Sequence, residues 1–381
     1  MTPAQNMYPE TTPIDNPDLA GTAAGCPPRA KDEKKRGSRA QGRLLPCRPC
    51  LCAALGLLAV FGLFGAALSD SNAEASDRLR IALQKTGTFS WELAVARGEE
   101  PLKEAGLDIE VMEVASPEAA KIALLGGSAD LILSDWLWVA RQRNFGEKLV
   151  FYPYSAAVGA LMVPKASNIH NLADLEGKKI AVAGGPLDKS WLMLQAFAKR
   201  SGLELPRQAD ILYGAPALLY QKALSGEADA SLNYWNFCAA LEARGYRRFL
   251  SIDEVERSLG AEGKVAMVGY VFREEFAKTH APALARFFAA AAKAKDILAH
   301  SEAAWEKIGE RLGIADKAEL ALYRQTYIEG IPRRPIANEA ADARQLYRVL
   351  AKTGGQELVG DAAELDEGTF YQLPEAVQGE R

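Results

Sequence analysis

A glycine-rich turn between an apolar strand and a helix has residues suited to binding a ligand. Residues 178–191 read KKIAVAGGPLDKSW, in which a short apolar run ends at Gly184 and Gly185. Glycines allow the backbone to turn sharply and approach a ligand, and Asp188 is a favourable N-cap for the helix that follows. Free N–H groups at the start of that helix would favour negative charge at the sheet's carboxyl edge. The predicted binding loop comprises Gly184, Gly185, Pro186, Leu187 and Asp188.

A similar stretch about one hundred residues earlier predicts a second loop of the same kind. Residues 80–91 read RIALQKTGTFSW, again an apolar strand, a turn and a helix that opens with Ser-Trp. The correspondence continues at an offset of 99 residues: LGGSAD at 125–130 matches LSGEAD at 224–229, and SDW at 134–136 matches NYW at 233–235. Matched order over this length predicts two lobes of like topology that face each other across a cleft.

The remaining candidate ligand-binding residues lie at strand ends in both halves. Trp136 and Trp235 each follow the carboxyl end of a strand, where side chains project into a cleft. Asp135 would attract an ammonium group, whereas a helix N-terminus would hold a carboxylate or sulfonate. This mixture favours a zwitterion or a flat heterocycle over nitrate. The other candidates are Thr86, Gly87, Thr88, Phe89, Ser134, Asn233 and Tyr234.

Each candidate also has a purely structural interpretation. The first loop could be an ordinary strand-to-helix turn, and Asp188 could serve only as a helix N-cap. The tryptophans could pack against their own sheets instead of contacting a ligand.

Composition limits the class of protein. The chain has 381 residues, 49% of them hydrophobic and 25% charged, which is enough for about two domains. Its formal net charge of −4 gives no basic surface for nucleic acid. The three histidines, at 170, 280 and 300, are too scattered for a metal site or a histidine-based catalyst. We therefore expect no cofactor, no metal and no nucleic-acid partner.

The N-terminal segment predicts export. Residues 1–42 show no apolar period, which predicts a disordered extension or a start codon placed too early. Residues 43–75 are interpreted as an export signal: basic Arg43, an uncharged apolar run over 51–68, and a small-x-small cleavage pattern over 73–75. An uncleaved membrane anchor is the alternative, because 18 apolar residues can just span a bilayer.

The remaining chain predicts an α/β protein in which two lobes are joined by two crossings. Lobe one is expected at 76–160, lobe two at 161–264, and a return strand with C-terminal helices of lobe one at 265–360, followed by a tail at 361–381. Alternating apolar runs and helical periods underlie this division. Strands are predicted at 79–84, 108–114, 131–133, 148–154, 180–183, 210–213, 230–233 and 249–252. The crossings are placed at 156–164 and 267–272, and the C-terminal helices at 281–300, 302–312, 318–327 and 338–353.

The export signal, the paired lobes and the phrases ALLGGSADLILSDW and ALSGEADASLNYW resemble the nitrate/sulfonate/taurine (NMT1/THI5-like) family of type II periplasmic binding proteins. The resemblance implies a monomeric solute-binding component of an ABC importer. Its partners would be a small polar solute, a membrane permease and the ATPase subunit. The solute would be a sulfonate- or taurine-like anion or zwitterion, or a pyrimidine or thiamine precursor. A THI5-like enzyme is a further alternative. The chemistry that this resemblance implies needs a substrate histidine and a cysteine-rich iron motif, whereas Cys238 is the one cysteine after the export signal and no histidine lies near either loop in the sequence.

Overall fold

The computed structural model describes residues 77–84, 87–98 and 101–374. The predicted N-terminal extension, the export signal, Thr86 and the last seven residues of the tail lie outside the described residues. Among the helices that the structure does describe, none combines the length and apolar character that membrane crossing requires.

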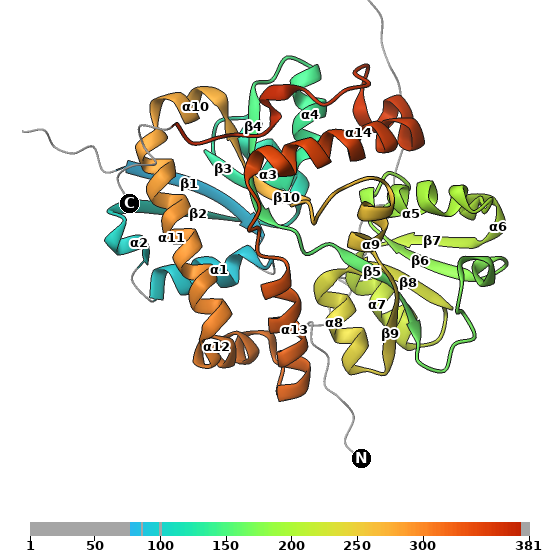
Figure 1. The fold of residues 1–381 in the computed structure, drawn as a ribbon. Helices are drawn as coiled ribbons and strands as arrows, with labels where there is room; N and C mark the ends of the chain where they lie inside the picture. The colour runs from blue at the N-terminus through green and yellow to red at the C-terminus, as the bar shows by residue number, and fades with distance from the viewer. Residues whose placement is uncertain (1–76, 85–86, 99–100, 375–381) are drawn as a thin grey trace, which may run out of the picture. The chain divides into compact units, whose positions relative to one another are not determined.

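Two five-stranded mixed sheets organise the described chain (Figure 1). The strand order is β2-β1-β3-β10-β4 in the first sheet and β7-β6-β8-β5-β9 in the second. The first sheet contains β1 (Asp77–Gln84), β2 (Leu107–Val114), β3 (Leu131–Asp135), β4 (Leu149–Ser155) and β10 (Val268–Arg273). The second contains β5 (Gly159–Pro164), β6 (Lys179–Ala183), β7 (Asp210–Gly214), β8 (Ala230–Tyr234) and β9 (Tyr246–Ser251).

The two sheets have equivalent topology, as the sequence repeat predicted. In the first sheet β1 runs parallel to β2 and β3, and β10 is antiparallel to β3 and β4. In the second sheet β6 runs parallel to β7 and β8, and β5 is antiparallel to β8 and β9. Ile81 and Ile180 therefore occupy corresponding strands of different sheets. Each crossing contributes the fourth strand of the sheet that the chain enters.

The repeated Gly-x-Ala-Asp phrase fixes the register of these strands. Asp130 accepts a hydrogen bond from the backbone N–H of Arg80 through its carboxylate (2.9 Å), and its own N–H donates to the Arg80 carbonyl (2.8 Å). Asp229 makes the same two bonds to Lys179, at 2.8 and 2.9 Å. The phrase is therefore a structural motif that ties β1 to the chain before β3 and β6 to the chain before β8.

Helices occupy most of the remaining described chain (Figure 1). They are α1 (Phe89–Gly98), α2 (Pro101–Glu104), α3 (Pro117–Leu125), α4 (Trp136–Asn144), α5 (Lys189–Arg200), α6 (Leu205–Gln208), α7 (Pro216–Leu224), α8 (Trp235–Ala243), α9 (Ile252–Ser258), α10 (Glu274–Thr279), α11 (Ala281–His300), α12 (Glu302–Leu312), α13 (Lys317–Glu329) and α14 (Ile336–Val359). The predicted bounds of α11 and α12 are confirmed. The predicted end of the last helix, at 353, was wrong: α14 continues to Val359 through a kink at Gly355.

Helix α11 brings a lysine to a buried carboxylate of α1. Glu92 is 1% exposed and accepts hydrogen bonds from the hydroxyls of Tyr270 (2.7 Å) and Tyr327 (2.9 Å) and from the ammonium of Lys295. That ammonium also lies 3.9 Å from the ring centroid of Tyr154. Burial lowers the pKa of Lys295, against the opposing influence of Glu92. The ion pair links α1 and α11, with tyrosines from β4, β10 and α13 around it.

Both crossings are held by the chain around the start of α14. Just before the return crossing, Asp342 accepts hydrogen bonds from the N–H groups of Glu262 (3.0 Å) and Gly263 (3.2 Å). Glu339 accepts one from the N–H of Ala266 (2.9 Å). At the first crossing, the N–H of Ala156 donates to the carbonyl of Gly330 (2.8 Å). These bonds satisfy backbone groups that no sheet would otherwise pair.

Gly159 marks a close approach between β5 and β8. A Cβ placed on Gly159 would lie 2.0 Å from the carbonyl oxygen of Asn233. Gly159→Ala should therefore lower the free energy of unfolding by about 2 to 3 kcal/mol, since the backbone must shift to admit the methyl group. Gly185→Ala is the control, because its Cβ would have no atom within 4 Å. Denaturant unfolding followed by circular dichroism measures both; equal stability of the two variants would contradict this strand pairing.

Candidate functional site

The candidate site is a cluster of four charged or polar residues at the carboxyl ends of three strands. Asp135 ends β3 of the first sheet, Asp188 and Lys189 follow β6, and Tyr234 ends β8 of the second sheet. The Asp135, Asp188 and Tyr234 side chains each raise the pKa of Lys189, as groups close to it would. The carboxyl edge is where open α/β sheets bind ligands. Candidate residues from both halves of the repeat are thus brought together.

Two helices begin at this cluster, and an aspartate caps each of them. The Asp135 carboxylate accepts a hydrogen bond from the N–H of Trp138 (2.9 Å) at the start of α4. The Asp188 carboxylate accepts bonds from the N–H groups of Ser190 (2.9 Å) and Trp191 (3.2 Å) at the start of α5. The structural interpretation of Asp188 as an N-cap therefore holds. Capping also places both carboxylates where the helix dipoles favour negative charge.

Lys189, the first residue of α5, supplies the cation of the cluster. Burial opposes its charge, but the carboxylates of Asp135 and Asp188 outweigh burial and raise the pKa of Lys189 above its ordinary value. Tyr234 and Glu256 contribute in the same direction. Lys189 is therefore protonated at neutral pH, beside one carboxylate from each half of the repeat.

In the two acidic groups Asp188 and Tyr234, burial prevails and favours the neutral form. Burial raises the pKa of the Asp188 carboxyl, and Asp135 adds to this increase while Lys189 and two backbone N–H groups oppose it. Burial also raises the pKa of the Tyr234 hydroxyl, to which Asp188 and Asp135 contribute. Tyr234 is nevertheless 38% exposed, so its ring offers a surface to a ligand. The cluster contains an ammonium, two carboxylates and a phenol.

The glycine-rich loop has one position that requires glycine. Gly184 has a backbone φ of +95°, which residues other than glycine rarely adopt. A Cβ at this position would lie 3.1 Å from the Asp188 side chain. Gly185 has no positive φ and open space around it. Pro186 is exposed and Leu187 is half-buried. The sharp turn therefore requires glycine at 184, whereas the backbone at Gly185, whose carbonyl accepts the N–H of Asp188 (2.9 Å), does not require glycine.

The first loop makes mainly internal contacts. Gly87 donates its N–H to the carbonyl of Gln84 (3.0 Å), and the Thr88 hydroxyl lies 3.4 Å from that of Tyr154. Phe89 is 3% exposed and packs edge-on against Tyr154 and Tyr270. Thr86 lies outside the described residues. Phe89 therefore belongs to the hydrophobic core in this conformation.

The two tryptophans expected to line the cleft are both buried. Trp136 has no exposed surface and packs against Tyr347 of α14, with ring centroids 6.5 Å apart. Trp235 is 7% exposed and packs edge-on against Trp91 of α1 at 6.1 Å. Neither ring presents a face to a ligand in this conformation, because helices distant in sequence cover them. The Trp91–Trp235 contact joins a helix that follows β1 to one that follows β8.

Ser134 and Asn233 occupy matching positions at the ends of β3 and β8. Asn233 is 3% exposed; its amide donates to the carbonyl of Pro216 (3.0 Å) and its side-chain oxygen accepts from the N–H of Tyr234 (2.8 Å). Ser134 is 7% exposed, and its hydroxyl has no partner in the described chain. Asn233 therefore shapes the turn that presents Tyr234.

Lys189 was missed by sequence reasoning. The stretch DKSW at 188–191 predicts an N-cap and a helix start, and it also carries a lysine at the first helical position. A cation beside a helix N-terminus is an available signal for an anion site.

Within the described ranges, no group of three or more His, Cys, Asp or Glu residues could hold a metal ion.

Comparison with known proteins identifies the family. Residues 93–304, more than half of the chain, match the family described as NMT1/THI5 like. The chain belongs to this family, as the resemblance of its sequence phrases predicted. A search of curated proteins returned no match.

Solved structures share the fold at low sequence identity. The periplasmic aliphatic sulphonate binding protein SsuA from Escherichia coli has a TM-score of 0.61 and 19% identity, over 78% of this chain and 94% of that one. The alkanesulfonate-binding protein SsuA from Xanthomonas axonopodis pv. citri, bound to MOPS, has a TM-score of 0.59 and 20% identity, over 76% and 96%. The desulfurization enzyme DSZB has a TM-score of 0.52 and 15% identity, over 79% and 98%. The fold is that of the periplasmic binding proteins.

Proposed function

We propose that this protein is the exported solute-binding component of an ABC importer. It takes up a small polar organic solute, such as a sulfonate, a taurine-like zwitterion or a related organic anion. The observation that carries the proposal is Lys189, a charged ammonium at a helix N-terminus beside Asp135 from the other sheet. Family membership and a fold shared with two sulfonate-binding proteins support it.

The cluster can bind both charges of a zwitterion. An acidic group of the solute would pair with the Lys189 ammonium at the start of α5, where the helix dipole also favours negative charge. An amino group of the solute would pair with Asp135. Because these partners come from different sheets, a bound solute would hold the two lobes closed.

A solute-binding component of an importer has two lobes, a location outside the cytoplasmic membrane and membrane partners. The lobes comprise residues 76–160 with 265–360, and residues 161–264. The monomer acts outside the cytoplasmic membrane, after cleavage of the export signal or anchored by it. It delivers the solute to a membrane permease that is driven by an ATPase subunit. A pyrimidine- or thiamine-precursor heterocycle is the alternative solute, and the half-exposed ring of Tyr234 would suit it.

Enzymatic activity is a second candidate, because DSZB shares the fold. Cysteine chemistry requires a thiolate. Cys238 has no exposed surface, and burial raises the pKa of its thiol to about 12. The Cys238 thiol is therefore protonated and inaccessible at neutral pH, which favours binding over cysteine catalysis.

Calorimetric titration with taurine, short alkanesulfonates and an aminopyrimidine tests the binding site. Lys189→Gln should lower the affinity for the solute that binds by at least about tenfold, because a charge-assisted hydrogen bond is lost. Lys179→Gln is the matched control: Lys179 lies at the opposite end of β6 and is exposed. Equal affinity of Lys189→Gln and the wild type would contradict the proposed site.

A further inference from the structure

A groove on the protein surface lies away from the candidate solute site. It has a volume of about 530 Å³ and is bounded by the C-terminal half of α5, by α6 and by α14. Its lining includes accessible apolar side chains, those of Ala196, Pro206 and Val349, and the buried side chains of Leu203, Leu205 and Leu259. Volumes of this size are typical of small-molecule sites. The groove thus offers an apolar floor to an aliphatic group.

Four cations surround this floor. Lys199 and Arg200 come from α5, Arg207 from α6 and Lys352 from α14, and all four are exposed. The one carboxylate in the lining belongs to Glu204, which pairs with Arg207 at 3.0 Å. The lining thus carries four positive groups and one negative group, so the groove is locally positive although the whole chain has a net charge of −4. The groove should therefore attract anions.

Two of these cations are available to a ligand. Arg200 donates to the carbonyl of Ser258, and Arg207 is engaged with Glu204. The side-chain ammonium groups of Lys199 and Lys352 have neither an ion pair nor a hydrogen bond to any residue that the structure describes. They lie on different helices, α5 and α14, which pack against each other. An anion between them would gain two charge-assisted contacts.

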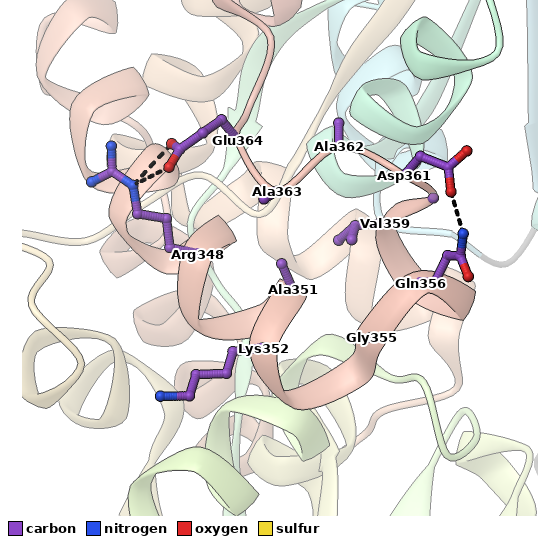
Figure 2. Close-up of a pocket in the computed structure, with 11 residues that line it drawn as sticks. Arg348, Ala351, Lys352, Gly355, Gln356, Val359, Asp361, Ala362, Ala363 and Glu364 are labelled. Atoms are coloured by element: carbon purple, nitrogen blue, oxygen red, sulfur yellow. Dashed lines mark hydrogen bonds and ion pairs between the residues drawn. The ribbon is translucent and has the colours of Figure 1, made fainter.

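A neighbouring pocket of about 540 Å³ differs from the groove because its Arg348 and Gln356 side chains are bonded to acidic residues of the same pocket. Its Arg348 is paired with Glu364, with the guanidinium Nε 2.9 Å from both carboxylate oxygens, and its Gln356 is bonded to Asp361. Figure 2 shows both pairs, with Lys352 outside them. The polar groups of that pocket thus satisfy one another, whereas Lys352, which lines both hollows, remains free for the groove.

We propose that the groove between α5, α6 and α14 binds a single-chain amphipathic anion. The aliphatic chain lies on Ala196, Pro206 and Val349, where it is removed from water. The anionic head lies between Lys199 and Lys352. This site is distinct from the solute site, because Lys189 and Lys199 are ten residues apart on α5, or ~15 Å along the helix.

Decyl sulfate below its micelle concentration is the probe, titrated into the purified protein by calorimetry at low salt. We expect one bound molecule per chain. Inorganic sulfate, which has the charge without the tail, and decyltrimethylammonium, which has the tail with the opposite charge, should each bind at least about tenfold more weakly. Raising the salt concentration should weaken binding of decyl sulfate.

The variant Lys199→Gln/Lys352→Gln should lose at least about tenfold in affinity for decyl sulfate. Lys317→Gln, which removes an exposed cation of α13 outside the groove, should bind like the wild type. Lys189→Gln should also bind like the wild type, which separates this site from the proposed solute site. The inference is overturned if the double variant retains wild-type affinity, if decyltrimethylammonium binds as tightly, or if Lys189→Gln abolishes binding.

Discussion

Replacing Lys295 by methionine should lower the free energy of unfolding by about 3 to 5 kcal/mol. The substitution leaves the Glu92 carboxylate, which is 1% exposed, without the cation that balances its charge. Hydrogen bonds from Tyr270 and Tyr327 remain, but they do not neutralise it. Denaturant unfolding monitored by circular dichroism measures the loss.

Two further variants make this test specific. Lys293→Met removes an exposed lysine of the same helix, α11, whose ion pair with Glu104 is solvent-accessible, and it should unfold like the wild type. Lys295→Met/Glu92→Gln removes both buried charges and should recover much of the lost stability. The interpretation fails if Lys295→Met is as stable as Lys293→Met.

The free energy of unfolding should fall as the pH rises from about 5 to 8.5, because two buried carboxyl groups lose their protons in this range. Burial raises the pKa of Glu256 from 4.5 to about 8 and that of Glu339 from 4.5 to about 7. Between those values the folded protein holds protons that the unfolded chain has released. The stabilisation is therefore complete below pH 4.5 and is lost as the pH rises through the folded values.

Glu256→Gln isolates the larger of these effects. The Glu256 side chain is fully buried, and this burial outweighs the opposing influence of the Val265 backbone N–H on its pKa. The difference in unfolding free energy, variant minus wild type, should increase by about 2 kcal/mol or more between pH 5 and pH 8.5. Glu262→Gln, at an exposed position just before the return crossing, should show no such trend. A pH-independent difference for Glu256→Gln would contradict the assignment.

The fold could be predicted because its local signals are repeated. The strands that contain Ile81 and Ile180 are each followed by a glycine turn and by a helix that opens with Ser-Trp. Each repeat also includes an aspartate, Asp130 or Asp229, that fixes the strand register. Helix α9 was missed because seven residues are too few to show a helical period. Its capping box, Ser251 with Glu254, was nevertheless visible in the sequence.

The candidate site was harder to predict because its geometry depends on distant residues. Trp136 is buried by Tyr347, which belongs to a helix near the end of the chain. Lys189 acquires its chemical role from Asp135, which lies in the other half of the repeat. No local pattern carries either relationship. The sequence could therefore locate the loops, but not which side chains meet.

Native mass spectrometry of the protein purified from its own periplasm tests the central claim most directly. We expect the wild-type chain, beginning near Ser76, to carry one small organic molecule. We expect Lys189→Gln, shown to be folded by circular dichroism, to have largely lost that molecule, and Lys179→Gln to retain it. A wild-type protein with no bound solute, or a solute retained equally by Lys189→Gln, would contradict solute binding at this site.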